Sequence, residues 1–269
     1  MQLPDDLQSC YTHACSQTNI TDWRPLNAQG TSNYLFRAGK GQQILRINAP
    51  AERAVGVCRH REAGIMELFQ DHPWMVKTLS NQPDKGWCCL YDYGDHDSSD
   101  IISAARAQLI EIIRQLQTAS VSTAALNFKF DAIWDTYEQI ITEHQASKEK
   151  QDACQRLRHE LHSTIQLQQQ LPSTPTVPGH QDLHPGNLSL SKGQLILLDW
   201  EYAGLCHPWL DAAGLITQFG FAPDEVNQLP AFKHLEREQF SVAASAAVRF
   251  NKQLEALWFQ AREIAGEQM

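Results

Sequence analysis

The sequence predicts an α+β protein with two lobes, a strand-rich first third followed by a helix-rich remainder. Residues 26–93 contain short segments of aromatic and branched residues bounded by glycines, which is typical of strands. Beyond residue 101, apolar residues recur at helical spacing over long stretches. An acidic polar stretch, DHDSSD, follows Gly94 between the two parts. We therefore expect one domain over residues 1–93 and a second over residues 94–269.

Composition excludes several classes of protein. The 269 residues carry a net charge of −9 and no run of lysine and arginine, which argues against a nucleic-acid partner. The seven cysteines are odd in number and form no C-x-x-C pair, so a disulfide framework or a structural zinc site is not expected. The N-terminal stretch MQLPDDLQSCYTHAC is acidic and lacks the apolar core of a secretory signal. No apolar run reaches the roughly 18 residues that cross a bilayer. We expect a cytoplasmic protein with no membrane partner.

The first third predicts a hairpin, a helix and a further strand. SNYLFRA and QQILRIN, within residues 26–48, flank the glycine turn Gly39-Lys40-Gly41. Residues 52–70 have helical spacing. The residues expected to face inward on this helix are Ala63, Met66 and Leu68. WCCLYDY, residues 87–93, predicts a strand that ends at Gly94.

The remainder predicts mostly helices and a single hairpin. Ile101–Thr118 is helical, and residues 131–171 form two further helices, which prolines 172, 175 and 178 bring to an end. The helix at 101–118 has four residues on one side, Leu109, Ile112, Ile113 and Leu116. NLSL and QLILLDW flank the turn Ser191-Lys192-Gly193 and predict a second hairpin. The chain is again helical from about residue 209.

The loop HQDLHPGN, residues 180–187, gathers four polar side chains that carry chemistry. They are His180, Asp182, His184 and Asn187. Pro185 and Gly186 exclude a regular helix there. Because a tight hairpin brings its two ends together, Asn187 before it and Asp199 after it should be neighbours. Asp182, Asn187 and Asp199 are therefore expected to converge.

This spacing is typical of phosphoryl transfer. That reaction needs a carboxylate to orient and deprotonate the attacking hydroxyl and oxygen ligands for Mg²⁺. The protein-kinase catalytic loop spaces these groups as H-x-D-x-x-x-x-N, and a separate metal-binding Asp follows a hairpin. His180, Asp182 and Asn187 keep that spacing, and Asp199 supplies the fourth element.

HQDLHPGN, together with LLDWEYAG and the downstream Asp211 in LDAAGL, resembles the aminoglycoside phosphotransferase and choline kinase family. The DWEY version looks most like the choline kinase and thiamine kinase branch. The resemblance implies a protein-kinase-like two-lobed fold that uses ATP and Mg²⁺. It also implies that Asp182 is the catalytic base and that Asn187 and Asp199 bind Mg²⁺. His180 and Asp211 would support the loop.

The resemblance extends to the first third, which would be the nucleotide-binding lobe. GTSNYLF stands where the family has its nucleotide-covering loop, so Thr31, Ser32 and Asn33 are expected at the nucleotide. Arg46 stands where family members carry Lys or Arg, and Glu62 would hold it. An arginine can grip phosphate in a bidentate fashion. The strand with Tyr91 would meet adenine.

The second part, residues 94–269, would then be the catalytic and acceptor-binding lobe. We expect the partners to be a nucleotide and a small-molecule alcohol, choline- or thiamine-like and cationic. Glu201 with Trp200 and Tyr202, and with Trp209 nearby, would hold the positive charge. In the competing interpretation these aromatic residues are core. The identity of the acceptor, the choice between ATP and GTP and the oligomeric state stay open.

Two other interpretations compete with the kinase. The first is a metal-dependent hydrolase that holds its metal with His180, Asp182, His184, Asp199 and His207. It leaves Arg46 and Glu62 unused, and Asn187 is a poor zinc ligand. The second is a nucleotide-binding pseudokinase, against which the complete set of Asp182, Asn187 and Asp199 argues.

Overall fold

The computed structural model describes residues 3–26, 32–50, 53–94, 98–121 and 123–265. The chain forms two compact units, the first made of Met1–Ala105 and Gly186–Glu201 and the second of Arg106–Pro185 and Tyr202–Met269. The predicted α+β architecture is confirmed. The functional boundary between residues 93 and 94 stays a prediction. Thr31, a predicted nucleotide residue, lies outside the described residues.

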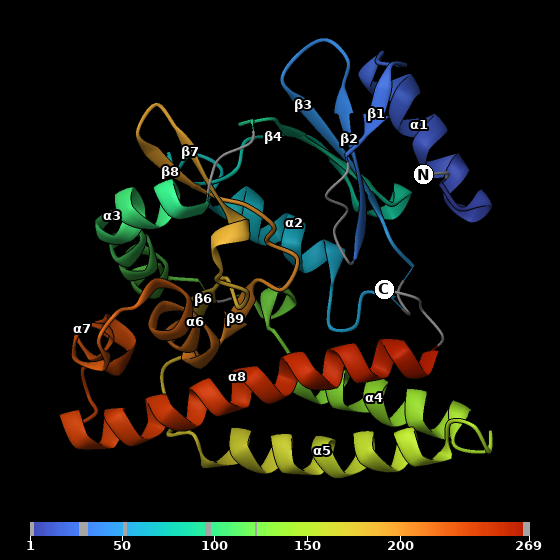
Figure 1. Cartoon of the computed structure of the whole chain (residues 1–269). Coiled ribbons are helices and arrows are strands. Elements are labelled where there is room, and N and C mark those ends of the chain that lie inside the picture. Colours follow the sequence, from blue (N-terminus) through green and yellow to red (C-terminus); the bar gives the residue numbers. More distant parts are fainter. Residues whose placement is uncertain (1–2, 27–31, 51–52, 95–97, 122, 266–269) are drawn as a thin grey trace. The chain divides into compact units, whose positions relative to one another are not determined.

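The first unit contains a five-stranded antiparallel sheet in the order β1-β2-β3-β5-β4 (Figure 1). Its strands are β1 (Trp23–Pro25), β2 (Asn33–Ala38), β3 (Gln43–Asn48), β4 (Thr78–Gln82) and β5 (Trp87–Tyr91). The predicted hairpin is β2–β3, and the predicted strand over WCCLYDY is β5. Strands β1 and β4 were not predicted. Both are edge strands of the sheet, β1 with only three residues and β4 with polar, largely exposed residues, so neither has the alternating apolar pattern of a strand.

The hairpin β7 (Leu188–Ser191) and β8 (Gln194–Leu197) belongs to the first unit. Its two-residue turn has φ 52° at Lys192 and φ 80° at Gly193, the left-handed conformations of a type I′ turn, so the predicted turn is confirmed. The Leu197 N–H donates to the Trp74 carbonyl at 2.8 Å. This hydrogen bond ties the hairpin to the segment between α2 and β4.

The second unit is mainly helical. Helix α3 (Ser98–Thr118) leads into it, and its other helices are α4 (Phe130–His144), α5 (Gln151–Gln170), α6 (Trp209–Phe219), α7 (Pro223–Asn227) and α8 (Arg237–Ala265). Figure 1 shows α4, α5 and α8 lying side by side. The two predicted helices over 131–171 are α4 and α5, and α5 ends before the first proline. Short strands β6 (Val177–Gly179) and β9 (Gly204–Cys206) pair antiparallel and were not predicted.

The buried face of α3 is the predicted one. Leu109, Ile112, Ile113 and Leu116 are all at most 3% exposed. Within the described ranges, none of the helices combines the length and the apolarity that a membrane crossing requires.

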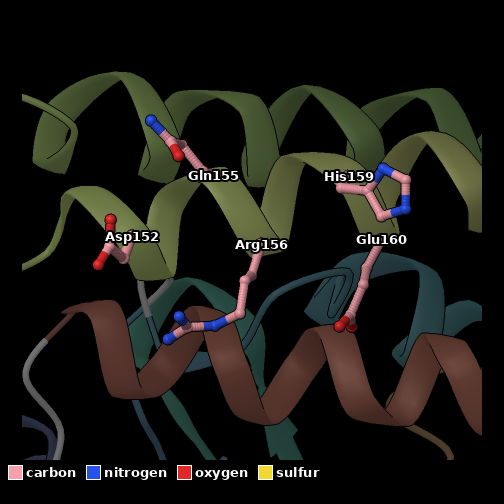
Figure 2. A pocket seen from close by; sticks show the side chains of 5 residues that line it. All are labelled: Asp152, Gln155, Arg156, His159 and Glu160. Atoms are coloured by element: carbon pink, nitrogen blue, oxygen red, sulfur yellow. The ribbon is translucent and has the colours of Figure 1, made fainter.

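A shallow pocket of about 370 Å³ lies along α5 (Figure 2). It is lined by residues of successive turns on one face of the helix, namely Asp152, Gln155, Arg156, His159 and Glu160. Glu160 accepts a hydrogen bond from Gln260 of α8 at 2.6 Å. The pocket contains none of the residues that the sequence predicts to act in phosphoryl transfer.

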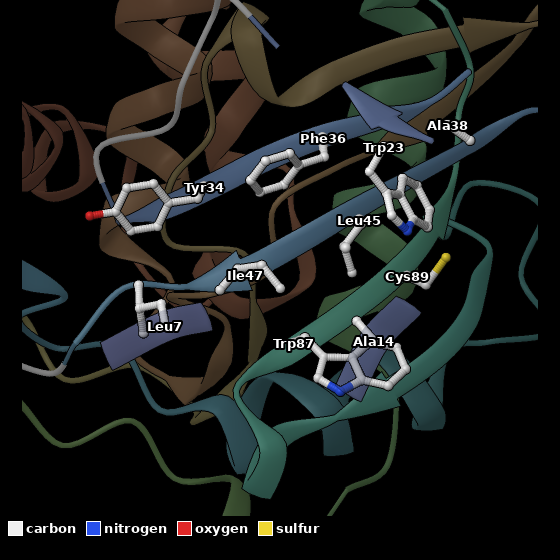
Figure 3. Close-up of a cluster of buried hydrophobic side chains, with 10 residues drawn as sticks. All are labelled: Leu7, Ala14, Trp23, Tyr34, Phe36, Ala38, Leu45, Ile47, Trp87 and Cys89. Atoms are coloured by element: carbon white, nitrogen blue, oxygen red, sulfur yellow. The ribbon is translucent and has the colours of Figure 1, made fainter. Parts of the chain in front are cut away.

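One face of the sheet is covered by α1 (Gln8–Thr18) and the short 3₁₀ turn η1 (Asp5–Leu7) before it. Figure 3 shows the buried cluster at this face, to which η1 and α1 contribute Leu7 and Ala14. Strand β3 contributes Leu45 and Ile47, both fully buried. Because side chains alternate along a strand, Arg46 between them lies on the opposite face.

Helix α2 (Arg59–Leu68) is shorter than the predicted helix, and one predicted inward residue is wrong. Leu68 is 45% exposed, whereas Arg61 and Glu62 are buried together with Ile65 and Met66. The apolar pattern misplaced the buried face because two charged residues lie on it. Glu62 can be buried on this face because it forms an ion pair with Arg46.

Candidate active site

The predicted partners Arg46 and Glu62 form a buried bidentate ion pair. Arg46 donates from Nη1 to Glu62 Oε1 at 2.6 Å and from Nη2 to Oε2 at 2.8 Å. Their side chains are 5% and 1% exposed. Arg46 Nη1 also lies 3.8 Å from Asp199 Oδ1. The strand and the helix therefore bring one guanidinium to two carboxylates, one of them on the predicted metal loop.

The pair is held in its charged form. Burial opposes the charge on Arg46, but the carboxylates of Glu62 and Asp199 outweigh it and raise the pKa of Arg46 above its ordinary value. Burial likewise favours a neutral Glu62, yet Arg46 and then Arg59 lower its pKa. Cys88, opposite Arg46 in the sheet, has a pKa raised to about 12 by burial, so its thiol stays protonated.

Arg59 is a residue of this cluster that sequence reasoning missed. Its Nη1 donates to Glu62 Oε2 and to Glu201 Oε2, each at 3.1 Å. Its Nη2 donates to Asn33 Oδ1 at 2.7 Å and to the Ser32 carbonyl at 3.2 Å. Arg59 is the first residue of α2, and the local signal was a second basic residue three positions before Glu62.

The predicted nucleotide residues that the structure describes lie at the start of β2 and the end of β5. Ser32 and Asn33 are buried, and the Asn33 amide is occupied by Arg59 and Glu201. The hydroxyl of Tyr91 bonds to Gln42, and its ring packs edge-on against Tyr93. The contacts of these residues with a nucleotide stay predictions.

The two predicted metal ligands flank the base of the β7–β8 hairpin. Asn187 ends the 3₁₀ turn η5 (Pro185–Asn187), and its carbonyl accepts the N–H of Leu198 at 2.8 Å. Asp199 follows directly, so the expected approach of Asn187 and Asp199 is confirmed at the backbone. Asp199 has a φ of 53°, a left-handed conformation that is uncommon outside glycine and concentrates at functional sites.

The predicted acceptor residues differ in their surroundings. Trp200 is buried, stacks on Trp74 with ring centroids 5.9 Å apart and donates Nε1–H to the Leu197 carbonyl at 3.0 Å. Glu201 is 4% exposed and accepts hydrogen bonds from Arg59 and Asn33. Tyr202, in the second unit, is half-buried. The roles of Trp200, Glu201 and Tyr202 in acceptor binding stay predictions.

Trp209, the third aromatic residue predicted near the acceptor, lies in the core of the second unit. It is 2% exposed and packs against Phe232 and Phe240, with ring centroids 4.7 and 5.7 Å away. Its Nε1–H donates to the Pro172 carbonyl at 3.0 Å.

In the second unit, Asp211 of α6 holds the start of the predicted catalytic loop. Its Oδ2 accepts the N–H of His180 at 2.9 Å, and its Oδ1 accepts the N–H of Gln181 at 2.7 Å. Burial raises the pKa of Asp211 to about 6, and the two backbone N–H groups offset only part of that effect. Gln181 has a φ of 69°, so the loop turns sharply there.

The side chains after this turn have distinct environments. His180 is fully buried, and its Nδ1 accepts the Asp182 N–H at 3.4 Å, a contact of the supporting kind predicted for it. Asp182 and His184 are 40% and 42% exposed, with Oδ2 and Nε2 at 3.6 Å. The Asp182 carboxylate raises the pKa of His184 although burial opposes this.

Two glycines let neighbouring backbone approach the loop. A Cβ at Gly179 would lie 2.9 Å from Asp211 Oδ2. A Cβ at Gly214 of α6 would lie 2.8 Å from the carbonyl oxygen of Leu183. Real Cβ atoms do not tolerate such distances, so the Asp211 carboxylate approaches β6, and α6 approaches the loop at Leu183, only because these positions lack a side chain.

The geometry disfavours the hydrolase interpretation. Over the part of the chain that the structure describes, no three His, Cys, Asp or Glu side chains gather closely enough to hold a metal ion. His180 is fully buried, while Asp182 and His184 are part-exposed. His207 Nδ1 is instead hydrogen-bonded at the Thr174 carbonyl, 3.0 Å away.

Comparison with known proteins agrees with this geometry. The family model described as "Phosphotransferase enzyme family" matches residues 22–250. No curated protein sequence matched the chain. The fold is similar to choline kinase LicA from Streptococcus pneumoniae, with a TM-score of 0.68 and 19% identity over 98% of this chain and 94% of that one. A structure of LicA in complex with AMP is also similar.

Two further solved structures share the fold. An ethanolamine kinase from Plasmodium vivax has a TM-score of 0.66 and 12% identity, covering 97% of this chain and 83% of that one. The aminoglycoside phosphotransferase APH(3'')-Id from Streptomyces rimosus has a TM-score of 0.58 and 17% identity, covering 94% and 98%. The chain therefore belongs to the phosphotransferase enzyme family and has its kinase-like α+β fold. It is a small-molecule phosphotransferase of that family.

Proposed function

We propose that the protein transfers the γ-phosphoryl group of ATP to the hydroxyl of a small cationic alcohol, choline- or thiamine-like. The observation that carries the proposal is the placement of Arg46 against Glu62 and Asp199. Arg46 keeps its charge in that cluster, and its Nε is buried without an acceptor among the described residues. A charged guanidinium is suited to a phosphate oxygen.

Asp182 is proposed to act as the base. Its carboxylate accepts the proton of the acceptor hydroxyl while that oxygen bonds to the γ-phosphorus. The bond between the γ-phosphorus and its bridging oxygen breaks, and ADP leaves with the electron pair. Asp182 is part-exposed, as a base that must meet a substrate requires, and Asp211 and His180 support its loop.

Asn187 and Asp199 are proposed to hold Mg²⁺. Their oxygens are donors that suit a hard cation, and the hairpin brings the two residues to one end. A bound Mg²⁺ would neutralise charge on the nucleotide phosphates. Arg46 would orient those phosphates, and Ser32, Asn33 and the β5 strand with Tyr91 would contribute to nucleotide binding within residues 1–93.

Several observations support a cationic acceptor. The net charge is −9, and the similar structures include a choline kinase and an ethanolamine kinase. The predicted acceptor residues are Trp200, Glu201 and Tyr202. An aromatic ring can contribute about 2 kcal/mol to binding a desolvated cation. Of the three, Tyr202 has the side chain that is only half-buried.

The deciding experiment is an ATP-consumption screen over choline, ethanolamine, thiamine, homoserine, sugars and aminoglycosides. It is followed by matched pairs, choline against 3,3-dimethyl-1-butanol and thiamine against an uncharged hydroxyethylthiazole. We expect kcat/KM to favour the charged member by roughly 10²- to 10³-fold. Equal values within each pair, or turnover of a sugar or homoserine alone, would defeat the cationic acceptor and leave the phosphotransferase standing.

A further inference from the structure

We propose that Arg59 is a positioning residue that, with Glu201 and Asn33, fastens the nucleotide-covering segment to the loop carrying Asp199. All three side chains lie in the first unit. The inference rests on the proposed function, because it concerns binding of the metal–nucleotide complex. It gives Glu201 an internal role in place of the predicted contact with the acceptor.

The three side chains close a triangle of hydrogen bonds. Arg59 donates to Glu201 Oε2 at 3.1 Å and to Asn33 Oδ1 at 2.7 Å. Asn33 donates from Nδ2 to the same Glu201 oxygen at 2.9 Å. The corners come from the first turn of α2, the first residue of β2 and the segment after β8. Asn33 and Glu201 are 168 residues apart, so the triangle joins distant parts of the chain.

The donors of Arg59 are committed to protein acceptors. Each terminal nitrogen has two, Glu62 and Glu201 for Nη1 and Asn33 and the Ser32 carbonyl for Nη2. A guanidinium has only five N–H donors, four of them on these nitrogens. Arg46, by contrast, has a buried Nε without an acceptor among the described residues. Arg59 is therefore engaged with protein acceptors through both terminal nitrogens and orders its surroundings.

Burial makes the triangle obligatory. Glu201 is 4% exposed, and a buried carboxylate that loses its partners is strongly disfavoured. Glu62 accepts from both arginines, so a shift of Arg59 is felt at Arg46. Asp199 lies two residues before Glu201 and has the left-handed φ of 53°. The triangle thus fixes two parts of the predicted nucleotide site. One is the nucleotide-covering segment at Asn33, and the other is the segment after β8 that carries Asp199 and Glu201.

The test measures Mg·ATP binding by calorimetry in the absence of any acceptor. Arg59→Lys keeps the charge but cannot bond four acceptors at once, and Glu201→Gln keeps the volume but not the charge. We expect both to weaken Mg·ATP binding by about 10- to 100-fold, the range for hydrogen bonds to charged groups. The apparent dissociation constant for Mg²⁺ should rise as Mg·ATP binding weakens. The KM for the acceptor should change by less than about twofold. A matched control is Arg237→Lys, which changes an exposed arginine paired with Asp224.

A further variant, Asn33→Ala, tests the inference if Arg59→Lys or Glu201→Gln does not fold. Asn33→Ala removes the neutral corner and leaves Glu201 paired with Arg59. If the triangle acts as a unit, Asn33→Ala and Glu201→Gln combined weaken Mg·ATP binding no more than the larger single change. Additive effects, or a raised acceptor KM with unchanged Mg·ATP affinity in Glu201→Gln, overturn the inference. A wild-type protein that does not bind Mg·ATP overturns the proposed function, whereas binding by the wild type and equal binding by the variants overturns the inference alone.

Discussion

Asp211 accepts the backbone N–H groups of two consecutive residues, His180 at 2.9 Å and Gln181 at 2.7 Å. One buried carboxylate therefore fixes the orientation of the peptide that leads into Asp182. Gln181 adopts a φ of 69°, which a non-glycine residue keeps only where its surroundings enforce it. The two hydrogen bonds are the visible source of that enforcement.

Asp211→Asn should damage the loop and change how stability depends on pH. The amide oxygen of Asn can accept one of the two backbone N–H groups, but the amide NH₂ would face the other N–H and cannot accept it. The loop that carries Asp182 would lose one support, so we expect a lower kcat. The pKa of Asp211 is raised to about 6 from 3.8, so its contribution to stability is complete at low pH and is lost as pH rises through about 6. The stability advantage of the wild type over the variant should shrink by roughly 2 kcal/mol between pH 4 and pH 7. Denaturant unfolding of both proteins across that range checks this, and a difference independent of pH would contradict it.

Asp182→Asn should abolish most turnover and leave nucleotide binding largely intact. The amide keeps the volume of the side chain but cannot accept the proton, and general-base catalysis typically contributes about 10²- to 10⁴-fold. The measurements are kcat with an identified acceptor and nucleotide affinity by titration. A variant with near-normal kcat would remove Asp182 from the role of base.

Activity should require Mg²⁺ or Mn²⁺, and chelation should abolish it. Asn187 and Asp199 offer oxygen ligands, which hard cations prefer over zinc. Asp199→Asn is the sharpest variant, because Asn tolerates the left-handed φ of 53° while the charge is lost. Metal–nucleotide affinity and rate should both fall. Tight zinc in the purified protein, with hydrolysis that needs no ATP, would instead favour the hydrolase.

Arg46→Lys should raise the KM for ATP more than the KM for the acceptor, because one ammonium cannot replace the bidentate contact with Glu62. Glu62→Gln should act in the same direction. The double variant should be non-additive on ATP affinity, with a coupling of about 0.5–3 kcal/mol. Arg46→Lys keeps a cation beside Glu62, which avoids leaving that buried carboxylate unpaired. Strict additivity would separate the two residues functionally.

The elements that were predictable from sequence are those decided by local patterns. The β7–β8 hairpin follows from its turn residues, and the opposite faces of Leu45 and Arg46 follow from strand alternation. The pairing of Arg46 with Glu62 was expected from the family resemblance, in which a glutamate of the following helix holds the basic residue of the strand.

The parts that were missed depend on distant partners. Arg59 bonds to Glu201, 142 residues away, and no local pattern joins them. Strands β1 and β4, by contrast, pair with strands that follow closely in the chain, and they were missed because they are short or largely exposed. Helix α1 did leave a signal, since Leu7, Cys10, Tyr11 and Ala14 recur at helical spacing and pack on the sheet.

The first unit is discontinuous in sequence, since residues 186–201 return to it after the chain has entered the second unit. On a ribosome the first 105 residues emerge long before that segment. Until it arrives, the carbonyl of Trp74 lacks the Leu197 N–H, and Arg59 lacks Glu201. The first unit is therefore completed only late in synthesis. Bringing Glu201 to Arg59 closes a loop of 142 residues and carries the entropic cost of a long loop. A truncated product that ends before residue 186 would carry the residues of the sheet and of the Arg46–Glu62 pair but neither Asn187 nor Asp199.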